Sequence, residues 1–120
     1  MVGASIDRAM ATTAPEQRSG LCCAHYHRAV ELIGKRWTGA ILFVLLEHGP
    51  MRFSEVGGAV PDLSDRLLSE RMKELESEGI VCRTVREGAP VKVEYDLTAK
   101  GRALEPAVRA LKAWARTYVA

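Results

Sequence analysis

Hydrophobic and polar residues follow two different periods along the chain, and the period predicts where helices and strands lie. Apolar residues that recur every three or four positions predict an α-helix, whereas strict alternation predicts a half-buried strand. The predicted helices cover residues 23–33, 35–47, about 54–58, 64–78 and 98–118. The alternation of Val91, Val93, Tyr95 and Leu97 predicts a strand, and segment 81–86 is expected to pair with it as a hairpin.

Capping and chain-breaking residues delimit these elements. Gly34 is expected to end the first helix, and length favours a helix over a buried strand for the apolar segment 35–47. Ser54 and Ser64 are expected to cap the two helices that follow, because a serine hydroxyl accepts a hydrogen bond from an N–H of the first turn. Pro106 has no N–H to donate, so it predicts a helix start or a kink just before it.

The order of these elements predicts a mainly α fold with a small antiparallel hairpin. A group of three helices closed by a hairpin is the arrangement of a winged helix-turn-helix, here with one more helix at each end. Residues 1–20 are small, polar and aperiodic, and they predict a mobile tail. A single domain is therefore expected at 21–120.

Composition restricts the function less than the pattern does. Apolar residues make up 48% and charged residues 27% of the 120, as in a soluble globular domain. The net charge of +2 does not by itself indicate nucleic-acid binding. Three cysteines are too few for a disulfide framework and favour a reducing cytoplasm. No signal peptide is predicted, because residues 1–20 lack a continuous apolar core. No membrane span is predicted either, because the longest apolar run covers only 40–46.

The helix predicted at 64–78 has an apolar face, expected to contact the core, and a polar face that mixes donors with acceptors. The residues of this polar face are Arg66, Ser69, Glu70, Lys73 and Ser77. A solvated surface with ion pairs such as Glu70 with Lys73 is the simpler interpretation of this face. The short helix before it and the hairpin after it favour another interpretation, in which the helix enters the major groove of DNA.

Basic residues near the hairpin tip, Arg83, Arg86 and Lys92, support the DNA interpretation, because an exposed basic loop can contact phosphates or a minor groove. Arg71 falls by angle on the apolar side of its helix. Snorkelling and a phosphate contact are open for it, but an ion pair with a carboxylate such as Glu55 is favoured. The predicted DNA-binding residues are Arg52, Ser64, Arg66, Ser69, Glu70, Lys73, Arg86 and Lys92.

Five motifs, in order, resemble the HxlR-type winged helix-turn-helix transcriptional regulators. They are ELIGKRWTGAILFVLL, MRFSEV, LSDRLLSERMKELESEGIV, VKVEYDLTAKGRAL and a Trp in the final helix, and they span about 23–114. The resemblance implies a dimeric bacterial regulator that binds inverted repeats in double-stranded DNA and responds to an electrophile, an oxidant or a small aromatic ligand. It implies that Cys23 is a thiol sensor, with Ala24 where the family often has proline. Lys92 stands where the family's wing has arginine, which keeps the charge but loses the bidentate fork.

The last helix supports self-association independently of the resemblance. Its apolar residues span an arc of roughly 160°, wider than the arc of about 100° that a surface helix needs. One edge of that arc can cover the chain's own core and leave the other for a partner, since an exposed apolar patch is unfavourable in water. A homodimer through the first and last helices is therefore expected.

The stretch CCAHYH contains four potential metal ligands, Cys22, Cys23, His25 and His27. A structural metal is disfavoured, because adjacent cysteines chelate one tetrahedral ion poorly and no second ligand cluster exists. A thiol activated by the start of a helix and an inert thiol both stay open. Catalysis is not expected, because no oxyanion hole, phosphate loop or paired acid is present, and no cofactor is predicted. The alternative function is a winged-helix module that contacts only other proteins.

Overall fold

The computed structural model describes residues 23–119, so the predicted tail at 1–20 and Cys22 lie outside the described residues. The chain divides into two compact units, with the boundary between Gly34 and Lys35. Within residues 23–119, no helix has the length and apolar character that crossing a membrane requires.

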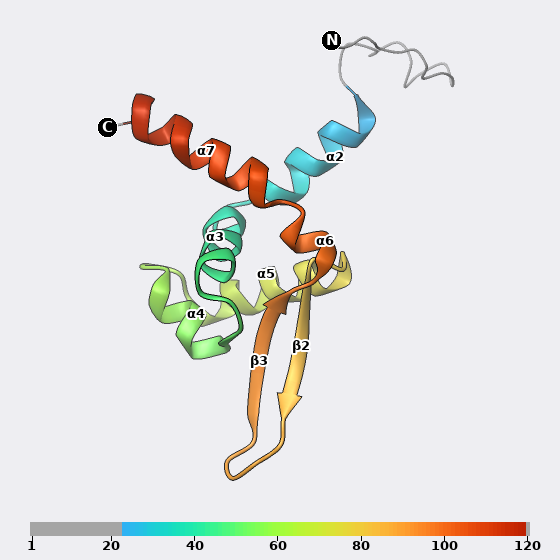
Figure 1. Cartoon of the computed structure of the whole chain (residues 1–120), viewed down its shortest axis with the longest axis vertical. Helices are drawn as coiled ribbons and strands as arrows, with labels where there is room; N and C mark the ends of the chain where they lie inside the picture. Colours follow the sequence, from blue (N-terminus) through green and yellow to red (C-terminus); the bar gives the residue numbers. More distant parts are fainter. Residues whose placement is uncertain (1–22, 120) are drawn as a thin grey trace. The chain divides into compact units, whose positions relative to one another are not determined.

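The described part of the first unit is the helix α2, Ala24–Ile33 (Figure 1). Cys23 occupies its N-cap position, and the N–H of Gly34 donates to the carbonyl of Val30 at 2.7 Å. The predicted helix at 23–33 and its end at Gly34 are therefore confirmed. None of the side chains of α2 is buried.

The second unit contains the remaining helices and a small sheet (Figure 1). Its elements are α3 (Thr38–His48), β1 (Met51–Arg52), α4 (Phe53–Ala59), α5 (Asp65–Ser77), β2 (Val81–Arg86), β3 (Lys92–Leu97), α6 (Ala99–Arg102) and α7 (Glu105–Tyr118). This order confirms the predicted winged helix-turn-helix, and the segment at 35–47 is a helix and not a strand. We call the β2–β3 hairpin, residues 81–97, the wing.

The core of the second unit lies where α3, α4 and α5 meet the base of the wing. Its fully buried side chains are Thr38, Ile41, Leu42, Leu45, Val56, Leu68, Met72 and Leu75. Helix α3 supplies half of them, because its apolar residues face several neighbours at once. It begins at Thr38 and not at the predicted Lys35, since Trp37 has a left-handed backbone (φ 78°) that a continuous helix excludes.

The sheet has three strands in the order β1-β3-β2, and every pairing is antiparallel. Val81 pairs with Leu97 at the base of the wing and Arg86 with Lys92 toward its tip. The hairpin prediction is confirmed, but the sequence did not indicate β1. Two residues are too few to display a period, and β1 exists because Met51 pairs with Tyr95.

The start of α4 differs from the prediction. Ser54 lies inside the helix, and Arg52 occupies the N-cap position. The side chain of Glu55 accepts a hydrogen bond from the backbone N–H of Arg52 at 2.8 Å, which satisfies one unpaired donor at this helix end. The predicted Ser54 cap is therefore wrong, because pairing of Met51–Arg52 with β3 places the cap two residues earlier, at Arg52.

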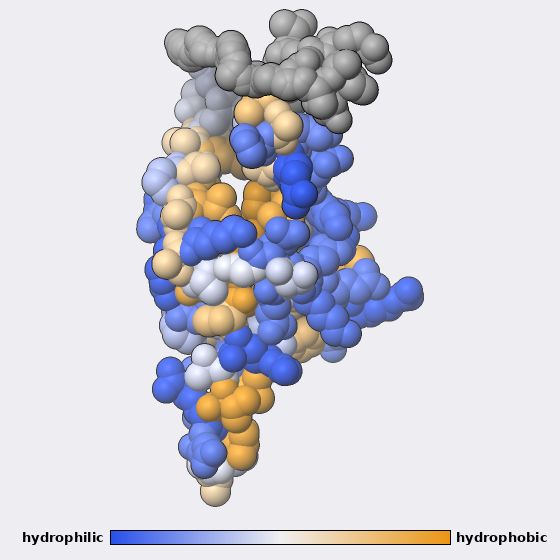
Figure 2. All heavy atoms as spheres, turned by 90° about the vertical axis from the view of Figure 1, so that its right-hand side faces the viewer, coloured by the Kyte–Doolittle hydropathy of each residue, from blue (hydrophilic) through white to orange (hydrophobic). Residues whose placement is uncertain are grey.

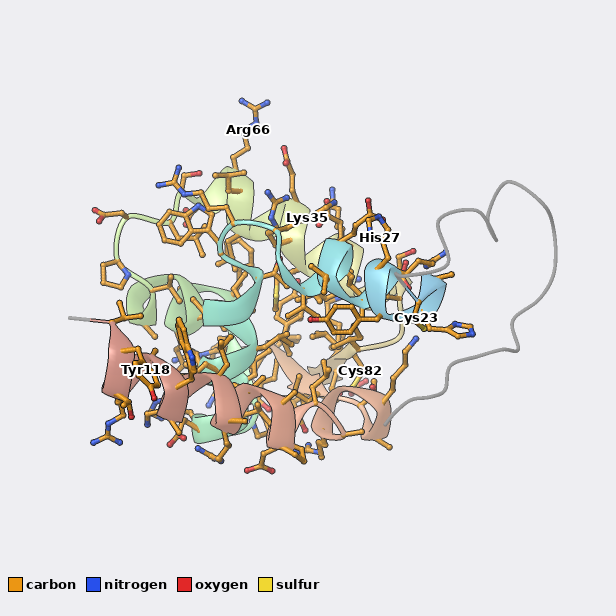
Figure 3. The ribbon with its side chains drawn as sticks, turned by 90° about the horizontal axis from the view of Figure 1, so that it is seen from above. Cys23, His27, Lys35, Arg66, Cys82 and Tyr118 are labelled. Atoms are coloured by element: carbon orange, nitrogen blue, oxygen red, sulfur yellow. The ribbon has the colours of Figure 1, made fainter. Side chains whose placement is uncertain are left out.

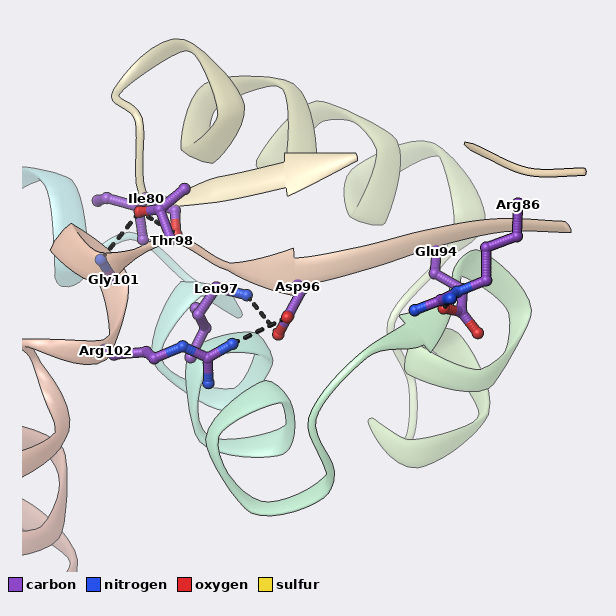
Figure 4. A network of polar contacts seen from close by, with 8 residues as sticks. All are labelled: Ile80, Arg86, Glu94, Asp96, Leu97, Thr98, Gly101 and Arg102. Carbon is purple, nitrogen blue, oxygen red and sulfur yellow. Dashed lines mark hydrogen bonds and ion pairs between the residues drawn. The ribbon is translucent and has the colours of Figure 1, made fainter. Parts of the chain in front are cut away.

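The base of the wing is held by contacts that follow β3 (Figure 4). The hydroxyl of Thr98 donates to the carbonyl of Gly79 at 2.5 Å and accepts from the N–H of Gly101 at 3.1 Å. A Cβ at position 101 would collide with the carbonyl oxygen of Ile80, so only glycine fits there. The final helical segment is divided into α6 and α7, and the helix start predicted just before Pro106 is confirmed at Glu105.

Candidate nucleic-acid interface

Helix α5 begins at the capping serine that the sequence predicts. The Ser64 hydroxyl accepts a hydrogen bond from the N–H of Leu67 at 3.2 Å. The negative charge of Asp65 in the first turn interacts favourably with the positive end of the helix dipole. One face of α5 is buried through Leu68, Met72 and Leu75. The side of α5 opposite this buried face is exposed.

The opposite side of α5, which we call the outer face, comprises Arg66, Ser69, Glu70, Lys73 and Ser77. Arg66 extends away from the ribbon into solvent (Figure 3) and pairs with Glu70 at 3.6 Å. The suggested pair between Glu70 and Lys73 is not formed, and Lys73 has no ion pair among residues 23–119. Ser69 is half-buried. The two cations of this face, Arg66 and Lys73, are exposed.

Arg71 lies on the inner side of α5, as its angular position predicts, with only 15% of its side chain exposed. Its Nε donates to the carbonyl of Arg36 at 3.0 Å, and its Nη1 lies 3.5 Å from Glu74. Lys35 approaches the same carboxylate at 3.1 Å. The favoured structural ion pair is confirmed, with Glu74 in place of Glu55 as the partner. These contacts fasten the segment before α3 to α5.

The three-stranded sheet brings together the other predicted basic residues. Strand periodicity and register place Arg52, Arg86, Lys92 and Glu94 on one face, with Arg52 opposite Glu94 and Arg86 opposite Lys92. Arg86 Nε donates to Glu94 Oε1 at 2.5 Å (Figure 4). Sequence reasoning missed Glu94, because only the strand register reveals which cations surround it.

The carboxylate of Glu55 lies beside the same group of charges. Its pKa is lowered, mainly because it accepts the backbone N–H of Arg52, and further because of the guanidinium of Arg52 and the charge of Lys92. Glu55 therefore remains ionised and caps α4 while it partly neutralises Arg52, whose Nη2 lies 3.4 Å away.

The wing also carries apolar side chains on its surface. Val85 and Val91 are exposed, and hydrophobic atoms gather near the wing tip, at the bottom of Figure 2. The tip thus combines an apolar surface with the charged face formed by Arg86 and Lys92. Such a hairpin can meet both the sugars and the phosphates of a nucleic-acid backbone.

The two described cysteines, Cys23 and Cys82, are exposed. Cys82 lies on β2 opposite Asp96, whereas Cys23 lies at the N-cap of α2. In the same helix, His27 Nε2 is 3.4 Å from Glu31. Among residues 23–119, no group of three His, Cys, Asp or Glu side chains is arranged to hold a metal ion.

Helix α7 exposes its apolar face. Leu111, Trp114 and Tyr118 are 64%, 55% and 72% exposed, and the rings of Trp114 and Tyr118 are 5.7 Å apart. Its opposite face carries Arg109, which binds Glu47 at 2.6 Å. Leu104, Val108 and Ala115 are partly buried, so one edge of the apolar arc contacts the unit while the other edge meets water.

Comparison with known proteins gives a consistent result. Residues 32–120 match the model of the HxlR-like helix-turn-helix family. The HTH-type transcriptional regulator YvaP of Bacillus subtilis, itself described as uncharacterised, is 47% identical over 97 residues, covering 81% of this chain and 89% of YvaP.

Two further relatives have solved structures. Reduced YodB from B. subtilis is 44% identical with a TM-score of 0.73 over 82% of this chain and 95% of its own, and a quinone-bound form has a TM-score of 0.69 at 41% identity, with coverage of 81% and 100%. The redox regulator HypR in its oxidised form is 35% identical with a TM-score of 0.75, over 81% of this chain and 99% of its own.

Proposed function

The chain belongs to the HxlR-like helix-turn-helix family, and from this we propose that it regulates transcription as a homodimer bound to an inverted-repeat operator in double-stranded DNA. The single observation that carries the proposal is the outer face of α5, which is polar, exposed and opposite a fully buried face. An α-helix fits the major groove of B-DNA, where side chains of this kind reach base edges and phosphates.

On this proposal the outer face of α5 reads the operator. Arg66 can donate to guanine, and Glu70 can accept from cytosine N4. Ser64 and Ser69 lie where their hydroxyls can contact the sugar–phosphate backbone of DNA, and Lys73 acts as a phosphate contact. Its ammonium, which has no ion pair among the described residues, is available to a phosphate without exchanging partners.

The sheet contributes contacts that hold the duplex without reading its sequence. Arg86 and Lys92 on the wing, with Arg52 at the start of α4, supply positive charge on one face of the sheet. Phosphate contacts set the position and orientation of a protein on DNA and carry no sequence information. The wing is therefore expected to raise the affinity for all duplexes alike.

The homodimer is proposed to form through α2 and α7. The exposed apolar side chains of α7 and the absence of buried residues in α2 support it, because both helices have apolar surface to cover. A two-fold axis between the subunits would set the two α5 helices about 34–36 Å apart, one turn of B-DNA. Inverted repeats of DNA match that symmetry.

The most specific part of the proposal is a response of the thiol to oxidants or electrophiles. Cys23 is exposed at the N-cap of α2, in one of the helices proposed to form the dimer. YodB has been solved with a bound quinone, and HypR is described as a redox regulator. We therefore propose that an oxidant or electrophile acting at Cys23 alters the dimer and releases DNA.

The test begins with selection of bound duplexes from random DNA, followed by a salt titration of the selected sequence. Lys73→Ala is expected to weaken binding to every duplex and to lower the slope of log K against log salt by about one. Arg116→Ala, which removes one exposed charge from α7, is the matched control and should leave the slope unchanged.

Three outcomes would contradict different parts of the proposal. An unchanged slope in Lys73→Ala removes this lysine from the phosphate contacts. Absence of binding to any duplex in dilute buffer, with and without oxidant, contradicts DNA binding and favours a protein-interaction module.

For the thiol, Cys23→Ser should abolish release of DNA by the oxidant diamide, and persisting release rules out Cys23 as the sensor.

A further inference from the structure

All three arginines assigned to DNA are already paired with glutamates, whereas the two lysines assigned to DNA have no ion pair among residues 23–119. The pairs are Arg52 with Glu55 (3.4 Å), Arg66 with Glu70 (3.6 Å) and Arg86 with Glu94 (2.5 Å). The unpaired cations are Lys73 and Lys92. Each arginine must therefore divide its charge and its N–H donors between a carboxylate and any phosphate or base that it contacts.

Glu94 differs from the other two glutamates in how firmly it is held. It lies on β3, the central strand of the sheet, between Arg52 on β1 and the strand that carries Arg86. Its side chain is only 21% exposed. Glu55 has a separate structural role as a cap of α4, and the pair of Glu70 with Arg66 is long and open to solvent.

We propose that Glu94 is a positioning residue that limits the affinity of the wing for DNA by holding Arg86 in an ion pair that competes with a phosphate. The inference rests on the proposed DNA-binding function. Arg86 Nε cannot donate fully to a phosphate while it donates to Glu94 (Figure 4). When Arg86 contacts a phosphate, the Glu94 carboxylate stays beside the duplex and repels it, because Glu94 is held in the central strand of the sheet.

The consequence is an affinity effect without a change of sequence preference. Arg86 is assigned to the backbone, so restraining it lowers binding to the operator and to unrelated duplexes by the same factor. Removing the restraint adds one effective phosphate contact, and the slope of log K against log salt steepens accordingly.

The experiment compares Glu94→Gln with Glu87→Gln in the full chain. Both substitutions remove one negative charge from the same wing, but Glu87 is exposed and has no ion pair among the described residues. Dissociation constants are measured for the selected operator and for a random duplex across a series of KCl concentrations. Glu94→Gln is expected to tighten both by about two- to fivefold, the range for an exposed ion pair, and to steepen the slope by up to about one. Glu87→Gln should change both less.

A second pair of variants tests whether Glu94 acts through Arg86. In an Arg86→Gln background, Glu94→Gln should have no larger effect than Glu87→Gln, because the restrained group is gone. Thermal melting of each variant verifies that the wing is folded. If Glu94→Gln and Glu87→Gln have equal effects, or if Glu94→Gln weakens binding, the inference is overturned while the proposed function stands. If the unmodified chain binds no duplex, the proposed function itself fails.

Discussion

Helices α5 and α7 have similar lengths and are both amphipathic, yet the apolar face of α5 is buried and that of α7 is largely exposed. Helix α5 buries Leu68, Met72 and Leu75 to within 1% of complete burial, against α3, α4 and the base of the wing. Helix α7 leaves Leu111 and Trp114 more than half exposed. Figure 1 shows the cause: α5 lies within the unit, whereas α7 lies at the end away from the wing tip and extends beyond α3.

The contrast shows what an apolar stripe does and does not specify. It specifies that one face of a helix is better removed from water, but not whether the covering surface comes from the same chain. Helix α7 is attached to its unit through the Glu47–Arg109 ion pair and through Lys112, whose Nζ lies 4.8 Å from the ring centroid of Phe43. Both contacts involve its polar edge, whereas Leu111 and Trp114 on the stripe remain more than half exposed.

The largest effect is expected from truncation inside α5. Leu68 is fully buried and lies against Gly57 of α4, so Leu68→Ala leaves a cavity and should lower the free energy of unfolding by about 2–5 kcal/mol. Leu111→Ala, at a protein concentration that keeps the chain monomeric, should change it by less than about 0.5 kcal/mol. Urea denaturation of both variants measures the difference, and equal losses would break the contrast between the helices.

Truncation on α7 should instead affect association. Trp114→Ser removes a large exposed aromatic side chain from the proposed dimer surface and should raise the dimer dissociation constant by about 30-fold or more, as for an interface hot spot of about 2 kcal/mol. Sedimentation velocity over a range of concentrations measures it. Arg116→Ser, on the polar side of the same helix, is the control. A dissociation constant unaffected by Trp114→Ser would exclude this face from the dimer.

The start of α5 can be tested against a serine that does not cap. Ser64→Ala removes the acceptor for the N–H of Leu67 and should lower the free energy of unfolding by about 1 kcal/mol. Ser54→Ala, inside α4, should cost clearly less because Ser54 does not occupy the cap position of that helix. Thermal or urea unfolding compares the two. A larger loss from Ser54→Ala would contradict the assignment of the helix starts.

The smallest effect concerns the polar attachment of α7. The hydrogen bond and charge of Arg109 lower the pKa of Glu47 below 4.5, its ordinary value, so the carboxylate binds a proton more readily in the unfolded chain. The stabilisation is present above about pH 4.5 and is lost as the pH falls through the lower folded pKa. Melting temperatures between about pH 6 and pH 3 should therefore fall less steeply in Glu47→Gln than in the unmodified chain. Glu76→Gln is the control, and identical profiles for the two variants would contradict the prediction.

The predictions from sequence were most successful where the cause is local. The cap at Ser64, the apolar face of α5 and the strands at 81–86 and 92–97 follow from residue spacing and from hydrogen bonds between near neighbours. The buried position of Arg71 also follows from its angle on the helix. Its partner does not, because Glu55 and Glu74 are both acidic and only the packed structure shows which one is near.

The predictions failed where a distant segment decides the outcome. Strand β1 and the helix start at Arg52 depend on pairing with β3, some forty positions later in the chain. The start of α3 depends on the left-handed backbone of Trp37, which no local preference of tryptophan indicates. The same holds for Glu94, which the register of the sheet sets between Arg52 and the strand of Arg86.

Spacing along the chain alone was enough to establish the order of the elements apart from β1, the polar outer face of α5 and the presence of a wide apolar stripe on the final helix. The tertiary fold decided which carboxylate each arginine pairs with. It left much of the apolar stripe of α7 exposed, whereas that of α5 is buried. The physical reason is the distance along the chain over which each interaction acts. Periodicity and capping act over a few residues, whereas ion-pair partners and burial depend on which segments the tertiary fold brings within a few ångströms of each other.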